Sequence, residues 1–428
     1  MSAAMKTDPY WWEAAPRPEI AAPSLPQNVD VAIVGSGYTG LIAALKLAEA
    51  GRSVAVFDSG AIGSGASSRN SGFVGRTLKY SFGDLVKSKG TDHAVATYGE
   101  MQSAFQAVAD TVAEYAIDCA FRVHGRLVLA ETAGQFEDIK REYDLRHRHL
   151  GSPFEILEKG ALPREIGSPR YVGGVILPDL ASIHPGLYHA GLVRAVNARG
   201  ITLHPFTRVS AFARDSNGFD VVTGRGRLRA RDVILATNGY TDGLLPWLQR
   251  RLIPFDAWQM ATETLPQGLI DQLLPNDRTY IDSFMNVDAI RRAPNDNRIL
   301  YTGKTGTRSD QVTMARRLMG ELKATFPDLK DVGVSHSWTG RCAATFDLLP
   351  HLGTHDGIHF AVGYCFAGLP MGSHFGRLLA QRILQPGSVK SVFADQPFRT
   401  VPLYQGNNWF VPWMMRYYDF KEGKRHAA

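Results

Sequence analysis

Cysteine is scarce in this chain: Cys119, Cys342 and Cys365 are the three in 428 residues. Their number is odd and their spacing is wide, so the sequence predicts neither a disulfide framework nor a cysteine-ligated metal site. Free thiols are usual in a reducing compartment. We therefore expect a cytoplasmic protein that binds no metal.

Long apolar runs and clusters of basic charge are also missing. No stretch reaches the roughly 18 apolar residues of a membrane span. The opening segment, MSAAMKTDPYWWEAAPRPEI, lacks the charged-then-apolar order of a signal peptide. The net charge of +6 is mild and no Lys/Arg run occurs. We therefore expect no nucleic-acid partner, while an anionic cofactor or substrate is compatible with this charge.

The most informative stretch is 31–58, VAIVGSGYTGLIAALKLAEAGRSVAVFD. An apolar run, predicted to be a buried parallel strand, leads into a G-x-G-x-x-G and then into a helical pattern. A second strand ends on Asp58, about 20 residues past the glycines, as a dinucleotide fingerprint requires. Gly35 allows the tight turn, Gly37 leaves room for a pyrophosphate, and Gly40 lets helix and strand pack closely. Asp58 can accept hydrogen bonds from a ribose diol. The alternative is a tight turn in an α/β protein without a nucleotide.

Two further segments could approach such a ligand. The loop 60–75, GAIGSGASSRNSGFVG, is rich in Gly and Ser, which lets backbone come close to a flat or charged group. Arg69 and Asn70 are its polar side chains that could reach phosphates or ring edges; a flexible surface loop is the alternative. RDVILATNGYTD (231–242) is predicted to be a buried strand whose carboxyl end carries small polar residues, where α/β folds bind ligands.

The remaining segments are of two types. Residues 250–326 alternate apolar and polar residues at period two, which favours antiparallel strands, and they close on an amphipathic helix before Pro327. We expect this part to form a lid over the nucleotide domain. Residues 334–386 return to strand, glycine-punctuated turn and helix. The aromatic segment PLYQGNNWFVPWMMRYYDF is predicted to pack as an arm, with membrane adhesion as the alternative.

Five motifs occur in the order typical of one family: GSGYTG with Asp58, GASSRNSGF, ILATNGYT, WTG…FDLLPHLG and GYCFAGLPMGSHFGRLLA. The chain resembles the FAD-dependent D-amino-acid oxidase superfamily, which includes glycine and sarcosine oxidases. It is most similar to the γ-glutamylputrescine oxidase branch, through a YW near the N-terminus, the SGRNGG-like loop, ATETL (261–265) and the PWF-like tail.

With this resemblance we expect an α/β fold: a Rossmann-like FAD-binding domain interleaved with a mainly antiparallel β-sheet substrate domain flanked by helices. The predicted boundaries are an N-terminal arm at 1–28, an FAD-binding domain at 29–82, 151–249 and 331–390, a substrate domain at 83–150 and 250–330, and a C-terminal arm at 391–428. In the N-terminal arm, Tyr10, Trp11 and Trp12 are expected to hold it against the domain; a partner-binding patch is the alternative.

The resemblance also implies which residues bind FAD. They lie along the pyrophosphate, the adenosine ribose, the adenine and the flavin ring: Gly35, Ser36, Gly37, Tyr38, Thr39, Gly40, Asp58, Ser59, Ser67, Ser68, Arg69, Asn70, Ser71, Val209, Ala236, Thr237, Asn238, Gly340, Gly368, Leu369, Pro370 and Met371. The family's GYSGHG is replaced here, with Cys365, Phe366 and Ala367 at the corresponding positions. The His is lost and Phe366 narrows the pocket. Because Cys342 is out of register with the cysteine that attaches FAD in sarcosine oxidases, we expect non-covalent FAD.

The implied reaction is oxidation of the C–N bond of a secondary amine or N-substituted amino acid of the sarcosine, iminodiacetate or γ-glutamyl amine type. The product is an imine that hydrolyses, and O2 is the expected acceptor, giving H2O2. The alternatives are a D-amino acid or glycine oxidase, a dehydrogenase with another acceptor, a non-catalytic flavin-binding subunit, and an NAD enzyme. The exact amine and the oligomeric state stay open.

A substrate carboxylate favours an arginine, whose guanidinium offers two parallel hydrogen bonds. The candidates are Arg76, Arg341 and one of Arg291 and Arg292, since strand alternation points those two to opposite faces. Lys304 is a further candidate, either to bind an anion or to help O2 accept electrons. The alternative for each of these side chains is a solvated position on the protein surface without a ligand. No general base is predicted, and the histidines 336, 351 and 374 are expected to be structural. Tyr280 and Trp258 could wall the pocket or pack in the core.

Overall fold

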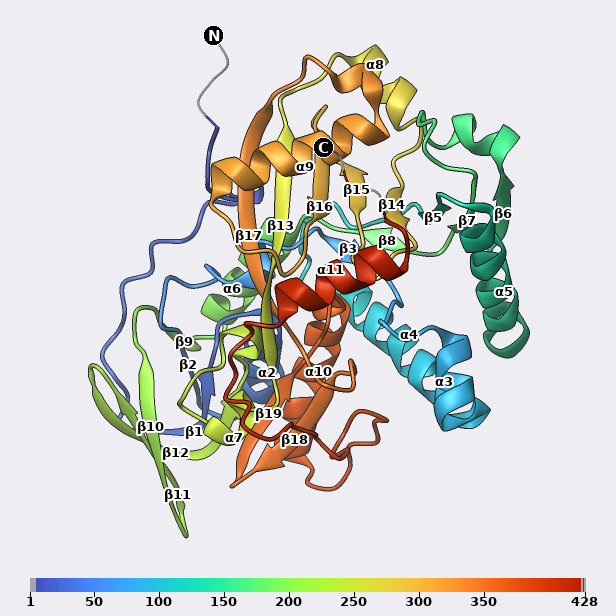
Figure 1. The fold of residues 1–428 in the computed structure, drawn as a ribbon. Coiled ribbons are helices and arrows are strands. Elements are labelled where there is room, and N and C mark those ends of the chain that lie inside the picture. Colours follow the sequence, from blue (N-terminus) through green and yellow to red (C-terminus); the bar gives the residue numbers. More distant parts are fainter. Residues whose placement is uncertain (1–4, 425, 427–428) are drawn as a thin grey trace.

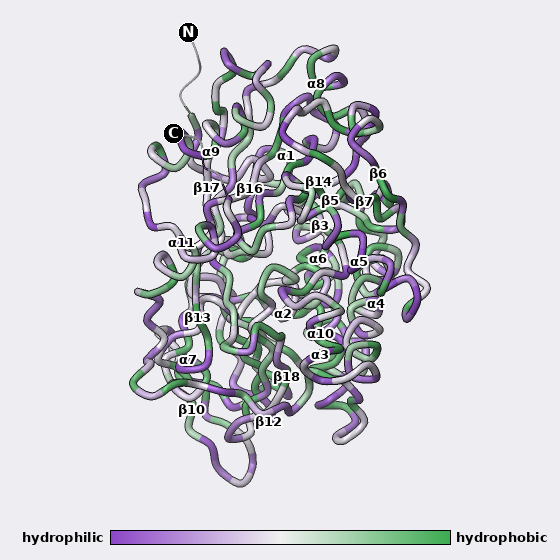
Figure 2. The backbone as a smooth tube through the Cα atoms, turned by 45° about the vertical axis from the view of Figure 1, so that its right-hand side comes forward, coloured by the Kyte–Doolittle hydropathy of each residue, from purple (hydrophilic) through white to green (hydrophobic). Residues whose placement is uncertain are grey.

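The computed structural model describes residues 5–424 and 426. Two large sheets lie one above the other (Figure 1). The first sheet occupies the lower half of the view and carries α2 and α10, and the second lies in the upper half beneath α9. Figure 2 shows apolar segments in the interior of both layers and mostly hydrophilic outer loops. Among the described residues, no helix has the length and apolar character to cross a membrane.

The first sheet is built on the predicted nucleotide-binding strands. Its strand order is β10-β11-β12-β1-β2-β9, and β19, paired with β18, joins it beside β12. Strands β12, β1, β2 and β9 pair in parallel, while β10 and β11 form an antiparallel extension. The bounds are β1 Asn28–Val34, β2 Val54–Phe57, β9 Thr202–His204, β10 Val209–Asp215, β11 Gly218–Thr223, β12 Gly226–Leu235, β18 His351–His355 and β19 Ile358–Val362.

Helices rich in alanine, leucine and glycine cover this sheet. In α2, three-quarters of the residues are buried, because its apolar face lies on the sheet and its other side packs against α10. Helix α4 packs on α10 in turn, and α6 on α2. The bounds are α2 Tyr38–Glu49, α4 Thr91–Glu114, α6 Pro185–Ala198 and α10 Gly368–Leu384.

The second sheet has the order β17-β13-β16-β15-β14-β5-β7-β6. All its described pairs are antiparallel except β14 with β5. Helix α9 packs against β13, β16 and β17. The bounds are β5 Arg126–Ala130, β6 Glu155–Glu158, β7 Gly173–Leu177, β13 Ile253–Thr262, β14 Thr279–Asp282, β15 Ala289–Arg292, β16 Ile299–Gly303, β17 Val334–Ala344, α8 Gln267–Leu273 and α9 Gln311–Thr325.

Short elements complete the fold. A three-stranded sheet of order β3-β8-β4 follows the glycine-rich loop, and α3 and α5 pack beside each other at the outer edge. The bounds are α1 Trp11–Ala14, α3 Phe82–Lys89, α5 Ala133–Leu150, α7 Pro246–Gln249, α11 Val411–Lys421, β3 Phe73–Val74, β4 Arg122–Val123, β8 Ala181–Ser182 and the 3-10 turns η1 Ala66–Ser68, η2 Lys159–Arg164, η3 Asn238–Tyr240 and η4 Pro327–Leu329.

The predicted fold class is confirmed: a Rossmann-like layer is interleaved along the chain with a mainly antiparallel one. The predicted domain boundaries stay a proposal. Strands β6, β7 and β17 pair in the second sheet, although their residues fall in ranges that we assigned to the FAD-binding domain. Pairing partners far along the chain decide this membership: β7 lies beside β5, and β17 beside β13.

The C-terminal arm crosses the front of the molecule between the two layers (Figure 1). Its helix α11 packs Val411 and Met415 into the protein. Beyond the helix, the Lys424 ammonium lies 3.0 Å from carboxylate oxygens of both Asp282 and Asp288, and its side chain is 1% exposed. The arm is therefore anchored by a buried charge cluster at the end of the second sheet.

His426 adds a pH-sensitive contact to this anchor. Its ring nitrogens lie 2.9 Å from Asp419 Oδ2 and 3.0 Å from Glu321 Oε1. Hydrogen bonds to Asp419 and Glu321 raise the pKa of His426 from 6.5 to about 9. A raised pKa in the folded state means that the protonated ring stabilises the docked arm fully below pH 6.5, and that this contribution is lost as the pH rises through about 9.

We expect limited proteolysis of the C-terminal arm to be faster in His426→Gln than in the wild type at pH 6.5, with the two rates converging above about pH 9. The ratio of the two rates at each pH cancels the pH dependence of the protease. A ratio that does not change between pH 6.5 and about 9.5 would show that the imidazolium contributes nothing to docking.

Candidate active site

A cavity of about 390 Å³ lies where the two layers meet. Its lining comes from the ends of the parallel strands, from the glycine-rich loop and from the second sheet, so segments distant in sequence share one site. The lining residues are 34–39, 57–60, 63–67, 70, 71, 73, 207–209, 235–238, 240–242, 244, 257, 259, 302, 340–342, 364–366, 368 and 369.

The turn from β1 to α2 brings bare backbone to this cavity. Gly35 has φ +109°, and a Cβ there would lie 2.7 Å from the Ala236 carbonyl oxygen. Gly37 precedes the first turn of α2 and supplies no capping side chain. A Cβ on Gly37 would lie 2.8 Å from Ser67 Oγ. The Tyr38 amide donates to Ser67 Oγ at 3.0 Å, and the following N–H groups of the first turn, with the helix dipole, make this turn suitable for the phosphates of a dinucleotide.

Asp58, at the end of β2, organises the same turn. One carboxylate oxygen accepts hydrogen bonds from Ser36 N (3.0 Å) and Ser36 Oγ (2.5 Å), and the other accepts from Gly60 N (2.9 Å). Oδ2 already accepts two hydrogen bonds, whereas Oδ1 accepts one and keeps a further lone-pair site. Asp58 lines the cavity, so it can fix the turn and still accept from a ribose hydroxyl.

The glycine-rich loop is an ordered turn rather than a flexible surface segment. The amide of Asn70 donates to Tyr38 Oη and to the carbonyls of Ala66 and Ser67. Ser68 is fully buried. Arg69 donates to the Ser64 carbonyl (2.7 Å) and its guanidinium lies 4.5 Å from the Trp12 ring centroid. The expected N-terminal arm thus packs directly on this loop.

The other end of the cavity is bounded by the turn that leads into α10. Cys365 and Phe366 have φ values of +42° and +75°, a left-handed conformation that costs of order 1–3 kcal/mol for residues other than glycine. The Phe366 side chain is 39% exposed and lies beside Phe255, with ring centroids 5.2 Å apart. A strained, apolar turn therefore faces the second sheet here.

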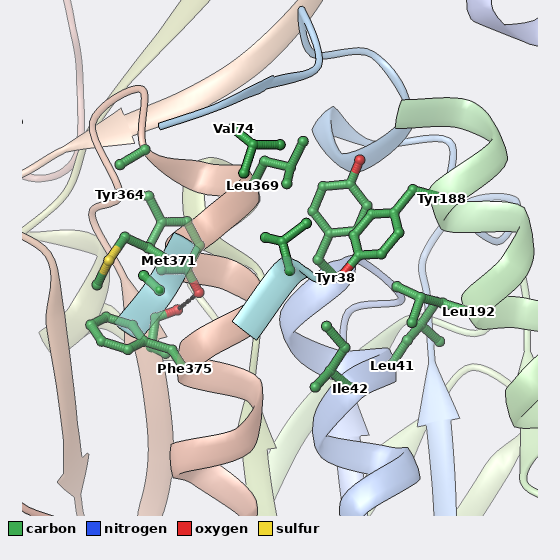
Figure 3. Packing of buried hydrophobic residues seen from close by; sticks show 14 of the residues in the cluster. Tyr38, Leu41, Ile42, Val74, Tyr188, Leu192, Tyr364, Leu369, Met371 and Phe375 are labelled. Atoms are coloured by element: carbon green, nitrogen blue, oxygen red, sulfur yellow. Dashed lines mark hydrogen bonds between the residues drawn. The ribbon is translucent and has the colours of Figure 1, made fainter. Parts of the chain in front are cut away.

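Figure 3 shows how buried hydrophobic residues at the starts of α2 and α10 pack together. Tyr38, Leu369 and Met371 lie in one buried apolar cluster. The hydroxyl groups of Thr39 and Tyr364 are hydrogen-bonded at 2.7 Å. This packing places both helix starts at the same cavity.

Most residues predicted to bind FAD line the cavity. The exceptions lie just behind the lining: Gly40, Ser68, Arg69, Pro370 and Met371. The glycine backbone and the carboxylate of Asp58 fit FAD. The expected placement, with the adenosine toward Asp58 and the ring toward Gly368, stays a prediction. The role of each residue stays a prediction.

Of the four charged candidates, Arg341 lines the cavity, where its Nε lies 3.1 Å from Asp256 Oδ1. The other three lie outside the lining and are paired. Arg76 binds Asp179 (2.6 Å), Arg292 binds Asp271 (2.9 Å) and Lys304 binds Glu321.

Tyr280 and Trp258 lie in the core of the second layer, not in the cavity. The predicted structural character of the three histidines agrees with their contacts: His351 binds Asp347, His374 binds Glu100, and His336 is 2% exposed near Glu13. Among the described residues, no group of three His, Cys, Asp or Glu side chains could hold a metal ion.

Gln259 and Thr302 are among the polar lining residues that sequence reasoning missed. Gln259 interrupts the apolar run of β13, and it is 4% exposed while its amide donates to the Arg69 carbonyl. A polar residue within a buried strand was the signal that could have identified it. Sequence reasoning also missed Lys79, whose Nζ lies 4.5 Å from the Phe366 ring centroid.

Comparisons with known proteins agree with this site. The γ-glutamylputrescine oxidoreductase of Escherichia coli is 31% identical over 377 residues, covering 87% of this chain and 88% of that protein. The probable oxidoreductase OrdL of Haemophilus influenzae is 28% identical over 374 residues, covering 86% and 85%. The crystal structure of glycine oxidase from Geobacillus kaustophilus has a TM-score of 0.72 and 25% identity, covering 88% of this chain and 99% of that one.

A family model described as "DAO: FAD dependent oxidoreductase" matches residues 30–382, which include every residue of the cavity lining. The superfamily expected from the five motifs is thereby confirmed, and with it the cofactor. This chain belongs to the DAO family of FAD-dependent oxidoreductases.

Proposed function

We propose that this enzyme oxidises the C–N bond of a secondary amine or N-substituted amino acid that carries a carboxylate, of the sarcosine, iminodiacetate or γ-glutamyl amine type. The product is an imine that hydrolyses to a carbonyl compound and an amine, with O2 as acceptor and H2O2 as its product. The similarity to γ-glutamylputrescine oxidoreductase supports this substrate class. We further propose that the FAD is not covalently attached.

One feature of the lining carries the proposal. At the end near Gly368 the lining residues are 71, 73, 257, 259, 302, 340–342, 364–366, 368 and 369, and none of these is a His, Asp or Glu. Bound FAD accepts the two electrons of the substrate. The protein's part is to orient the substrate and to provide a suitable electrostatic field. No side chain of this end is suited to act as a general base.

The alternative to a base is a site that favours the neutral amine. An alkyl ammonium has a free pKa of about 10.4. Apolar surroundings and nearby cations both lower it. Phe366, Leu369 and Ala257 supply the apolar surface. Arg341 also lines the cavity, but its charge is paired with Asp256, so the apolar surface is the main cause. A bound amine would therefore lose its proton to solvent on binding, and only the neutral form can release its electrons.

A second candidate is oxidation of a primary amino acid of the glycine or D-type. A glycine oxidase of Geobacillus kaustophilus is 26% identical over 363 residues, which favours it. The second candidate is limited to primary α-amino acids, in which the oxidised carbon carries both an unsubstituted amino group and the carboxylate.

The experiment that tests this function is anaerobic mixing of the yellow FAD-loaded protein with sarcosine, iminodiacetate, γ-glutamylputrescine, glycine and D-alanine. We expect at least one N-substituted compound to bleach the flavin absorbance, and we expect peroxide in a one-to-one ratio with bleached flavin when O2 is admitted. Faster bleaching by glycine or D-alanine would favour the second candidate. An FAD-loaded protein that none of the five bleaches would contradict both.

Peroxide-free reoxidation, or none, would assign a dehydrogenase with another acceptor. Flavin released by denaturation in trifluoroacetic acid separates covalent from non-covalent FAD. We expect the yellow colour to leave with the supernatant, because Cys365 is buried and Cys342 half-buried, and burial raises the pKa of their thiols to about 11 and about 12.

A further inference from the structure

Lys79 lies on the second-sheet side of the site, five residues after β3. Its Nζ is 4.5 Å from the centroid of the Phe366 ring, and Phe366 lines the cavity. Phe73, at the start of β3, also lines it. Lys79 is not itself among the lining residues, so its ammonium borders the cavity through the ring of Phe366.

We infer that Lys79 binds the carboxylate of the substrate. This inference rests on the proposed function and adds to it the residue that would select substrates bearing a carboxylate. Neither the family match nor the motifs assign a role to this position.

The ammonium of Lys79 has an incomplete set of hydrogen-bond partners. Lys79 donates one hydrogen bond, to the Met285 carbonyl at 2.6 Å. An ammonium has three donors and no acceptor. Within the part of the chain that the structure describes, no carboxylate lies within ion-pair distance of Lys79. Two donors of a half-buried cation therefore remain for a ligand.

The acidic groups near Lys79 already have other partners or are neutral. Asp282 is bound by Lys424 at 3.0 Å, and Glu422 accepts from Met285 N at 2.7 Å. Cys365 faces Lys79 as a buried thiol, and burial raises its pKa to about 11, so it is neutral at pH 7. Burial lowers the pKa of Lys79, which shows that its charge is poorly solvated. An anion placed beside it would offset that cost.

The other cationic side chains near this end of the cavity are either enclosed by the protein or already paired. Arg291 and Arg126 are each 3% exposed and enclosed by the protein. Arg126 donates to the hydroxyl groups of Thr77 and Thr279, and Arg291 donates to backbone carbonyls. Arg341 is 49% exposed and already pairs with Asp256. Lys79 combines access to the site with an unneutralised charge.

The test compares Lys79→Gln, which removes the charge and keeps a donor for Met285, with Lys79→Arg, which keeps the charge. Lys87→Gln, an exposed lysine on α3, is the matched control. FAD content and melting temperature are measured for each, and Lys79→Met serves if the Gln variant does not retain FAD. Rapid anaerobic mixing with the amine that reduces the wild-type flavin, and with its neutral carboxamide, yields the apparent Kd and the limiting rate separately.

We expect the apparent Kd for the carboxylate substrate to rise between about tenfold and a hundredfold in Lys79→Gln, as for loss of a charge-assisted hydrogen bond. The limiting rate should change little, Lys79→Arg should recover much of the affinity, and the carboxamide should bind the wild type and Lys79→Gln alike. Lys87→Gln should match the wild type throughout.

A second readout avoids turnover. Methoxyacetate has an ether oxygen in place of the amine nitrogen and cannot be oxidised in the same way, so its binding is followed by the flavin absorbance. We expect its Kd to rise in Lys79→Gln by the same factor as that of the substrate. If methoxyacetate does not perturb the wild-type flavin, its competition with the substrate in anaerobic mixing is the measure.

Three results would overturn the inference: an unchanged Kd for the carboxylate in Lys79→Gln, an equal loss for the carboxamide, or slower reoxidation by O2 with unchanged Kd, which would assign Lys79 to O2 instead. In each of these, amine-dependent bleaching of the flavin still stands. If no amine bleaches the flavin in any variant, the proposed function fails first, and the carboxylate role of Lys79 falls with it.

Discussion

In a Gly40→Ala variant we expect the protein to lose its FAD and to be colourless on purification. A Cβ at position 40 would lie 2.0 Å from the Gly35 carbonyl oxygen and 3.2 Å from Ile33 Cγ2. The first contact is with backbone, so the turn itself must move. Overpacking in a close-packed region costs about 1–3 kcal/mol or more, and a turn displaced by this contact no longer presents its N–H groups to the pyrophosphate.

We expect the FAD affinity of Gly40→Ala to fall by more than about a hundredfold, the equivalent of about 3 kcal/mol. The visible absorbance per protein and the Kd for FAD in the refilled apoprotein measure it. Gly99→Ala is the control, because Gly99 lies in α4 with an ordinary φ and nothing within 4 Å of its Cβ position. Helix propensity should make that variant equal or slightly more stable. A Gly40→Ala protein that binds FAD like the wild type would contradict the close approach of α2 to the turn.

Replacement of Arg291 should have the second large effect. Arg291 is 3% exposed and donates to the carbonyls of Ile183 (2.9 Å), Ser71 (3.2 Å) and Gly72 (3.4 Å). Arg291→Met leaves these carbonyls without their donor. A hydrogen bond to a charged group contributes about 1.5–3 kcal/mol, and buried acceptors left unpaired add to the loss. We expect a free energy of unfolding lower by about 3 kcal/mol and weaker FAD binding, because Ser71 lines the cavity.

Arg292→Met is the matched control, one residue along the same strand. Arg292 points to the opposite face and pairs with Asp271, whose side chain is 49% exposed. Exposed ion pairs contribute about 0–1 kcal/mol, so we expect a change below about 1 kcal/mol. Urea denaturation of both FAD-loaded variants gives the comparison. Equal losses in the two variants would show that Arg291 does not support the loop.

These neighbours illustrate what the sequence could and could not predict. Strand alternation correctly placed Arg291 and Arg292 on opposite faces. It did not indicate that the inward residue, Arg291, would donate its hydrogen bonds to backbone carbonyls of a loop some 220 positions earlier. The same limit applies to Arg76 and Lys304, whose acidic partners lie 103 and 17 residues away.

Local patterns were sufficient for the nucleotide-binding half of the site. The order of strand, glycines, helix, strand and Asp58 is written in consecutive residues, and backbone sterics fix its shape. The cavity's other end is assembled from five separate segments around positions 71, 259, 302, 341 and 366. Their proximity follows from the pairing of the second sheet, which no local pattern encodes. Lys79 was missed for that reason, since only the fold shows that no carboxylate of residues 5–424 and 426 pairs with it.

The span of the cavity lining, from residue 34 to residue 369, has a consequence for biosynthesis. A nascent chain cannot complete the site until α10 has left the ribosome, although the glycine turn that starts it emerges more than three hundred residues earlier. Cofactor incorporation must therefore be a late event that follows translation of nearly the whole protein, and until then the early strands need protection from aggregation.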